Sequence, residues 1–338
     1  MLVKNNALIM SVNDAAPILA ALPQAKLLNF KGRNIVAVRH TLDTAKVLNN
    51  LGLNAPSPIL HGDYDFPGRY TPMEKQLLTA QFLTLHSRAY CFNQMRTGKT
   101  ASALWASDYL LKTGKVKKVL IVSPLSVMDV WVNEGFSSIT HRTMTQLVGP
   151  PAKKIQLANE DTSYSVINFD GLRSLYHEEY YPKTKRVKKR WCDLDGIYDL
   201  IIADEADAYC NVTNWRWKAL NQLVKPETGL WLLTGTPTPN APTDAYGLIK
   251  LLTPSKVPDS FTLFQESLMR PAGPYKKVPR DGAWEKVNEL MQPAIRFKRD
   301  ECHLGTTISN HVTEMTEQQK KVFNDLKDKM YHEDQETE

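Results

Sequence analysis

One segment of this chain, AYCFN-QMRTGKT-ASALW, carries side chains that could bind phosphate groups and a metal ion. It predicts a strand, a loop and a helix, and main-chain N–H groups at the start of such a helix attract anions. Lys99 could reach the terminal phosphates of a nucleotide, Thr100 could offer its hydroxyl to Mg²⁺, and Gly98 lets the main chain approach closely. The full phosphate-loop pattern has glycine where this chain has Asn93, so an ordinary strand-to-helix turn also fits this segment taken alone.

Two further motifs could complete a site for phosphate chemistry. In DEAD, Asp204 could hold Mg²⁺ through water and Glu205 could orient an attacking water molecule, although a solvated acidic turn also fits this motif. In TGTP, Thr234 and Thr236 could respond to the phosphate state through Asp207, although this tetrapeptide alone favours a plain turn. The first two motifs together are a much stronger signal than either alone, because both follow apolar strands of one predicted sheet.

The elements around these motifs predict an α/β fold with an open parallel sheet flanked by helices. Five short apolar runs are typical of parallel strands buried on both faces: AYCFN, KVLIVS, YSVINF, YDLIIA and GLWLLT. The helix expected at ASALWASDYLLKTG ends at Gly114, and its apolar residues fall on roughly one face: Ala103, Leu104, Ala106 and Leu110. Ligands of such sheets bind at the carboxyl ends of the strands, which is where all three motifs lie.

Changes of pattern along the chain predict three regions. Residues 1–62 form a small α+β accessory domain, with strands expected at 7–12, 25–30 and 34–40 and helices at 14–22 and 41–52. Asp14 and Thr41 are the expected helix caps. Residues 63–254 hold the alternating strands and helices. Residues 255–338 are more helical and more charged, with helices expected at 260–270, 282–292 and 317–331.

Composition places the chain among globular proteins that function in water. Apolar residues make up 42% and charged residues 23% of the 338 residues, and the net charge of +6 is compatible with a polyanionic partner. The four cysteines form no C-x-x-C pair, which argues against a zinc site or a disulfide framework and fits a cytoplasmic location. Neither a signal peptide nor a membrane span is predicted, so we expect no membrane partner.

The chain order TGKT, DEAD, TGTP resembles that of superfamily-two helicases and, within them, the Swi/Snf-like DNA translocases. The resemblance runs from about Tyr70 to the C-terminus and includes the segments PLSVMDVWVNE, VINFDGL, LTGTPTPN, IRFKRDEC and TEQQKKVF. The style of the sequence is most similar to bacteriophage-encoded members, which would place the protein in the cytoplasm of a bacterial host.

The resemblance implies a first RecA-like P-loop domain that binds ATP, with roles for individual residues. Gln76 would bind the adenine edge. ATP would also contact the loop residues Arg96, Thr97, Gly98, Lys99 and Thr100. Mg²⁺ would be held by Thr100 and Asp204, and the catalytic residues would be Lys99, Asp204 and Glu205. DNA, as a duplex rather than a single strand, would contact Ser123, Leu125, Ser126 and Asn168, whereas Trp131 is expected in the core.

Two departures from the family pattern bear on this assignment. Arg96 stands where the family usually has glycine, and its side chain could crowd the loop or could help to hold phosphate. The tetrapeptide DEAD, where this group often has DEAH, is compatible with an RNA helicase, but the chain has no P-T-R-E-L-A segment and no S-A-T.

Motors of this family close ATP between two RecA-like lobes, and this sequence stops soon after TEQQKKVF. We therefore expect a second lobe to be supplied in cis, from a longer protein, or in trans, from another chain. Because the second lobe supplies arginine residues that stabilise charge on the γ-phosphate, the chain alone is expected to bind ATP and hydrolyse it slowly.

Basic residues suggest two further DNA contacts. The segment KTKRVKKR, at 183–190, is either a solvated surface loop or a loop that binds DNA phosphates. In the second case the contacts would be made by Lys185, Arg186, Lys188 and Lys189. The flanking Tyr180, Tyr181 and Trp191 are expected to be core or packing residues. The N-terminal region is either an accessory DNA-binding domain or a packing cap, and its basic residues are Lys26, Lys31, Arg33 and Arg39.

The leading hypothesis is an ATP-dependent DNA translocase or helicase that uses ATP and Mg²⁺. A non-catalytic ATP- or DNA-binding regulator remains an alternative, as does an RNA helicase. A metabolic P-loop kinase is the weakest alternative, because it would not need the PLSVMDVW or TGTP segments.

Overall fold

A computed structural model of the chain describes residues 1–302 and 316–324, apart from 31, 63 and 274–275. The chain divides into two compact units, Met1–Cys302 and His303–Glu338. In the second unit, residues 317–324 are helical, and the remainder of the helix expected at 317–331 lies outside the described residues.

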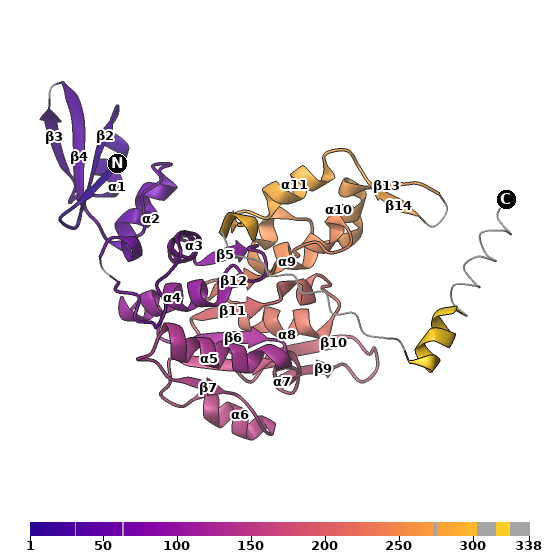
Figure 1. The fold of residues 1–338 in the computed structure, drawn as a ribbon. Coiled ribbons are helices and arrows are strands. Elements are labelled where there is room, and N and C mark those ends of the chain that lie inside the picture. The colour runs from indigo at the N-terminus through magenta and orange to yellow at the C-terminus, as the bar shows by residue number, and fades with distance from the viewer. Residues whose placement is uncertain (31, 63, 274–275, 303–315, 325–338) are drawn as a thin grey trace. The chain divides into compact units, whose positions relative to one another are not determined.

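The centre of the first unit is a seven-stranded sheet whose pairings are all parallel. Its spatial order is β15 (Ala294–Ile295), β5 (Arg88–Cys91), β12 (Gly229–Leu233), β11 (Leu200–Asp204), β6 (Val119–Ser123), β8 (Tyr164–Asn168) and β7 (Met144–Gln146) (Figure 1). All five expected strands are present, which confirms the α/β sheet. The short edge strands β7 and β15 carry too few apolar residues to be recognised from the sequence.

Helices cover both faces of this sheet. Successive strand residues point to opposite faces, so Ile201 and Ile202 belong to different hydrophobic clusters. One cluster includes residues of α3 (Glu74–Leu85), α4 (Lys99–Lys112) and α5 (Met128–Ser138). The other includes residues of α6 (Pro151–Ala158), α7 (Phe169–Arg173), α8 (Trp215–Leu223), α9 (Ala245–Leu252), α10 (Phe261–Leu268) and α11 (Ala283–Leu290).

Helix α4 differs from its expected one-sided pattern. Every residue from Ala101 to Leu110 is buried, including Asp108. The helix therefore packs on several sides, between the sheet, α3 and α5. The Asp108 carboxylate is paired in this interior by Tyr64, whose hydroxyl donates to it at 2.7 Å, and by Arg142 at 2.6 Å.

The segment after residue 254 contributes to the same compact unit. Residues of α10 and α11 lie in the main hydrophobic cluster, and β15 pairs with β5 through Ala294 and Ile295. A small hairpin joins β13 (Met269–Pro271) and β14 (Lys277–Pro279). Short 3-10 helices are η1 (Pro58–Leu60), η2 (Leu125–Val127), η3 (Ala206–Tyr209), η4 (Pro242–Asp244), η5 (Pro254–Lys256) and η6 (Asp300–Cys302). The domain boundaries expected after residues 62 and 254 remain predictions.

The N-terminal region is a four-stranded antiparallel sheet with two helices beside it (Figure 1). The strand order is β1 (Leu2–Lys4), β2 (Ala7–Val12), β4 (Arg33–Arg39) and β3 (Lys26–Phe30), and the helices are α1 (Ala16–Ala21) and α2 (Leu42–Asn50). Thr41 caps α2 as expected, accepting a hydrogen bond from the main-chain N–H of Thr44. Asp14 accepts from the N–H of Ala16 at the start of α1. Strand β1 was not predicted.

Candidate nucleotide site

The three motifs meet at one edge of the large sheet. Leu233, at the end of β12, pairs with Cys91 of β5 on one side and with Asp204 of β11 on the other. The phosphate loop, the TGTP segment and the acidic pair therefore leave neighbouring strands at the same carboxyl edge. A Cβ placed on Gly235 would touch the main chain of Met95 and Asn93, so the TGTP segment lies directly beside the phosphate loop.

Asn93, which replaces the glycine of the full phosphate-loop pattern, anchors the loop. Its side chain is 1% exposed. Its amide nitrogen donates to Oγ1 of Thr79 at 2.8 Å, and its amide oxygen accepts from the N–H of Phe297 at 2.9 Å. Its main-chain carbonyl accepts a 2.8 Å hydrogen bond from Nζ of Lys99. The asparagine therefore joins the loop to α3 and to the segment after β15, contacts that glycine could not make.

The loop itself contains two residues in the left-handed region, Arg96 at φ 66° and Gly98 at φ 78°. The Arg96 side chain is exposed, so it does not crowd the interior of the loop. The residue instead destabilises the loop through its left-handed backbone conformation, which L-residues rarely adopt. Thr97 is buried, and its hydroxyl donates to the carbonyl of Gln94 at 2.7 Å. The Thr97 side chain is thus used to hold the turn.

Gln76, expected at the adenine, lies against the phosphate loop. Its Oε1 accepts a 2.8 Å hydrogen bond from the N–H of Met73 at the start of α3. Its Nε2 lies where a Cβ on Gly98 would collide with it. Glycine at position 98 fits the left-handed backbone, and a Cβ there would displace the end of the Gln76 side chain.

The Asp204 carboxylate ends β11 in a buried position, 7% exposed. Its Oδ2 accepts a 2.9 Å hydrogen bond from Nε1 of Trp131, and its Oδ1 accepts a 3.0 Å hydrogen bond from the N–H of Glu205. Trp131 is fully buried, which confirms its expected place in the core. Glu205 has a left-handed backbone at φ 47°, and such strain is concentrated at functional sites.

Burial raises the pKa of the Asp204 carboxyl above its ordinary value, and the positive charge of Lys99 opposes this shift. Burial likewise raises the pKa of Glu205, with a further increase from the Asp204 charge and an opposing effect of Lys99. Lys99 is thus near enough to act on both carboxylates, as one site for a triphosphate and a metal requires.

The coupling residues expected from TGTP are in contact. The Thr234 hydroxyl donates to Oδ1 of Asp207 at 3.3 Å and accepts from the N–H of Thr236 at 3.1 Å. Thr234 is fully buried. These three residues therefore link the loop after β12 to η3, which follows the acidic pair.

The residues expected at the DNA backbone divide into two kinds. Leu125 and Ser126, in η2 after β6, are exposed at the carboxyl edge of the sheet. Ser123 is fully buried, and its hydroxyl donates to the carbonyl of Pro124 at 3.2 Å, so its side chain does not reach a surface. Asn168 caps α7 by accepting from the N–H of Gly171. Leu125 and Ser126 are thus the exposed side chains of this set, and Asn168 is half-buried.

The run at 183–190 is part of a β-hairpin, which corrects the expected loop. Strand β9 (Tyr176–Tyr180) pairs antiparallel with β10 (Val187–Cys192). Lys188 pairs with Glu179 at 2.7 Å and Arg190 with Glu178 at 2.8 Å, while Lys189 lies over the Trp191 ring. Among the described residues, no ion pair involves Lys185 or Arg186, which lie at the turn.

The aromatic residues that flank this run, expected to be core or packing residues, are exposed and do not lie in the core. Tyr180, Tyr181 and Trp191 retain 48%, 51% and 36% exposure. A two-stranded hairpin has no second layer to cover both of its faces, and Trp191 instead stacks on His177.

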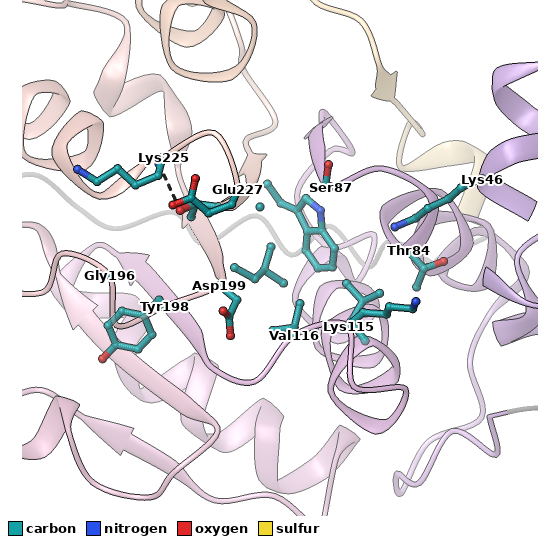
Figure 2. Close-up of a pocket in the computed structure, with 15 residues that line it drawn as sticks. Lys46, Thr84, Ser87, Lys115, Val116, Gly196, Tyr198, Asp199, Lys225 and Glu227 are labelled. Carbon is teal, nitrogen blue, oxygen red and sulfur yellow. Dashed lines mark hydrogen bonds between the residues drawn. The ribbon is translucent and has the colours of Figure 1, made fainter. Parts of the chain in front are cut away.

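A separate cavity of about 250 Å³ opens at the opposite, amino-terminal edge of the sheet. Figure 2 shows Lys46 and Lys115 on one side of it and Lys225, Glu227 and Asp199 on the other. It contains none of the motif residues. Asp199 is already used, accepting from the N–H groups of Lys117 and Lys118.

Sequence reasoning did not assign site roles to Asn93, Trp131 or Phe297. The sequence shows that position 93 lacks the usual glycine and that PLSVMDVWVNE contains a tryptophan. It does not show which residues hydrogen-bond to Asn93 and Trp131. Asn93 bonds to a residue 204 positions later, and Trp131 to one 73 positions later.

Known proteins resemble this chain over most of its length. It is 28% identical over 240 residues to "Uncharacterized ATP-dependent helicase YqhH" of Bacillus subtilis (strain 168), covering 70% of this chain and 38% of that protein. It is 27% identical over 218 residues to "Protein CHROMATIN REMODELING 19" of Arabidopsis thaliana, covering 59% of this chain and 26% of that protein. The chain thus spans less than two fifths of the length of either relative.

A solved structure shares the fold. The Sulfolobus solfataricus SWI2/SNF2 ATPase core in complex with dsDNA matches with a TM-score of 0.53 and 19% identity, covering 69% of this chain and 46% of that chain. No helix in the described part of the chain combines the length and apolar character needed to cross a membrane. The model of the SNF2-related domain matches residues 86–337. The chain therefore belongs to the SNF2-related domain family.

Proposed function

We propose that this chain is the ATP-binding lobe of an ATP-dependent DNA translocase or helicase. The observation that carries the proposal is that the phosphate loop, the TGTP segment and the acidic pair leave the carboxyl ends of three adjacent strands of one parallel sheet. Membership of the SNF2-related family and relatives named ATP-dependent helicases support it.

The phosphate loop would bind the triphosphate. Lys99 can exchange its bond to the Asn93 carbonyl for a phosphate oxygen, because a charge-assisted bond to an anion is the stronger of the two. The start of α4 directs main-chain N–H groups at the same place. Gln76, packed on Gly98, would meet the adenine edge with its amide.

Thr100 and Asp204 would hold Mg²⁺, and their hydroxyl and carboxylate oxygens are the donors that this ion prefers. When bound, the ion would neutralise charge on the phosphates. Both oxygens of Asp204 are oriented by protein N–H groups, which presents the carboxylate in one fixed position.

Glu205 would orient the attacking water and accept its proton. Its raised pKa makes it a better proton acceptor than an ordinary exposed glutamate, and its left-handed backbone turns it out of the strand direction. Asp207, Thr234 and Thr236 would report the state of the γ-phosphate, because they connect the loop beside the phosphate site to η3.

DNA would lie across Leu125, Ser126 and the turn of the β9–β10 hairpin. The SWI2/SNF2 core that shares this fold is described in complex with dsDNA, which supports a duplex as the partner. A second RecA-like lobe, in cis or in trans, would complete the ATP site. Bacteriophage origin and a cytoplasmic location remain predictions from the style of the sequence.

The test is a titration of the chain with a fluorescent ATP analogue and Mg²⁺. Lys99→Ala should abolish detectable binding, whereas Lys112→Ala, at the other end of the same helix, should bind as the unaltered chain does. Hydrolysis by the chain alone should be slow and should rise when a second lobe is added. Undiminished binding by Lys99→Ala would exclude the assigned site, and fast DNA-stimulated hydrolysis by the chain alone would exclude the need for a second lobe.

A further inference from the structure

The N-terminal sheet has one covered face and one open face. Leu8, Met10, Val36 and Val38 point to the covered side, where they join residues of α1 and α2 in a hydrophobic cluster. Figure 1 shows these two helices beside the sheet. Side chains alternate along a strand, so the residues next to these four point to the other side. We call that side the outer face.

The outer face is apolar, and its apolar residues on the two edge strands, β1 and β3, are exposed to solvent. Leu2 retains 58% exposure, Leu28 56% and Phe30 64%. The pairing places Leu2 beside Ile9 and Ile9 beside Ala37 in one row, and Leu28 beside Ile35 in the next row, so apolar residues occupy the outer face on all four strands. Patches of this kind on a protein surface mark interaction sites.

Basic residues lie at both ends of this apolar face. Lys4 and Arg39 both pair with Ala7, on opposite sides, at one end of the sheet, and Arg33 pairs with Phe30 at the other end. Lys26 occupies the edge strand. All four are exposed, and among the described residues no ion pair involves them.

The charge of this region is one-sided. Residues 1–40 contain five lysines and arginines but a single acidic residue, Asp14, whose carboxylate accepts from the N–H of Ala16. No acidic residue occupies an outer-face position in β1 to β4. The rim therefore attracts a polyanion and repels a basic partner.

We propose that the outer face binds single-stranded nucleic acid. Unpaired bases offer flat apolar faces that could lie on Leu28 and Phe30, while the phosphates of the same strand reach Arg33, Arg39 and Lys26. A duplex presents mainly phosphates and sugars to a flat surface and would leave the apolar residues unused. Binding of a single strand to the outer face would add to the duplex contacts proposed for the ATP-binding lobe. It would not require ATP.

The test compares the full chain and its variants by fluorescence anisotropy with a 20-nucleotide oligo(dT) probe and a duplex of the same length. The double variant Leu28→Ala/Phe30→Ala should bind oligo(dT) on the order of tenfold more weakly, the usual effect of losing a stacked base. Leu27→Ala is the matched control, because Leu27 is 47% exposed on the same strand but points to the other side. It should change the affinity less than twofold. Duplex affinity should be unchanged in both.

A second measurement isolates the basic rim. Arg33→Ser/Arg39→Ser should lower the slope of log affinity for oligo(dT) against log salt by roughly 1.4, since each single-strand phosphate contact contributes about 0.7. Circular dichroism would show that the variants remain folded.

Two results would overturn the proposal. One is an oligo(dT) affinity that is unaffected by Leu28→Ala/Phe30→Ala in folded protein. The other is a poly-glutamate peptide that binds through Phe30 while oligo(dT) does not, which would assign the face to an acidic protein partner. Lys99→Ala should retain full oligo(dT) binding, so failure of the proposed ATP site and failure of this face can be told apart.

Discussion

The indole N–H of Trp131 donates a hydrogen bond to the carboxylate of Asp204, over 2.9 Å, in the buried interior beneath the candidate nucleotide site. Trp131 belongs to α5, which begins immediately after the exposed residues Leu125 and Ser126 of η2. One short helix therefore joins a surface proposed to meet DNA with a carboxylate proposed to hold Mg²⁺. This is a direct route by which DNA contact could change the metal site.

Trp131→Phe keeps a six-membered aromatic ring in the buried position and removes the N–H donor with the rest of the indole. A hydrogen bond to a charged group is worth about 1.5–3 kcal/mol, so we expect the Mg²⁺ concentration for half-maximal ATP binding to rise on the order of tenfold. Trp105→Phe is the matched control, because Trp105 is equally buried but donates to the carbonyl of Ser138. Equal shifts of the Mg²⁺ titration in both variants would show that the effect is general loosening of the core.

The raised pKa of Asp204 predicts how stability depends on pH. In the folded chain this carboxyl keeps its proton to a higher pH than in the unfolded chain. Its contribution to stability therefore falls as pH rises from about 4, the ordinary aspartate value, through the raised folded-state value. Asp204→Asn does not titrate, so its thermal stability relative to the unaltered chain should increase across this window and then level off. If the difference in thermal stability between Asp204→Asn and the unaltered chain does not change between pH 4 and pH 8, the pKa of Asp204 is not raised in the folded chain.

Gln76 is predicted to select adenine. Gln76→Ala should lower the ratio of ATP to GTP affinity several-fold, because the amide would no longer meet the base edge. Gln81→Ala is the control on the same helix, since each glutamine accepts one main-chain N–H, from Met73 and from Ser57 respectively. If both variants keep the same ATP preference as the unaltered chain, then Gln76 is only a helix cap.

Arg96 is predicted to strain its loop. Arg96→Gly should stabilise the chain by up to about 1 kcal/mol, because glycine adopts the φ of 66° found here without steric cost. Arg96→Ala retains a Cβ and removes the charge, so it should give no such gain in melting temperature. The ATP affinities of the two variants separate the effect of the backbone conformation from the effect of the arginine charge. Equal melting temperatures of Arg96→Gly and Arg96→Ala would rule out backbone strain at this position.

The hairpin turn is predicted to contact DNA phosphates through Lys185. Lys185→Ser should lower the slope of log duplex affinity against log salt by about 0.9, the value of one phosphate contact. Lys188→Ser should change the slope less, because Lys188 is already paired with Glu179 at 2.7 Å. A slope that responds to neither substitution would mean that this hairpin is only a solvated surface.

Local patterns were enough to predict the central strands and the place of the three motifs at their carboxyl ends. A buried parallel strand needs only a short apolar run, and five such runs were recognisable from their length and apolar content. The two edge strands were missed for the same reason: β15 contributes only Ala294 and Ile295 to the sheet.

The sequence by itself determined which side chains could do phosphate chemistry, because a lysine, a threonine and two carboxylates following apolar strands are features of short segments. Only the tertiary structure decided which of these segments are neighbours. Placing β12 between β5 and β11 puts Thr234 next to Asp207, and folding α5 over the sheet brings Trp131 to Asp204. Contacts of this kind join residues far apart in the chain, and they depend on strand order and helix packing, which no local pattern encodes.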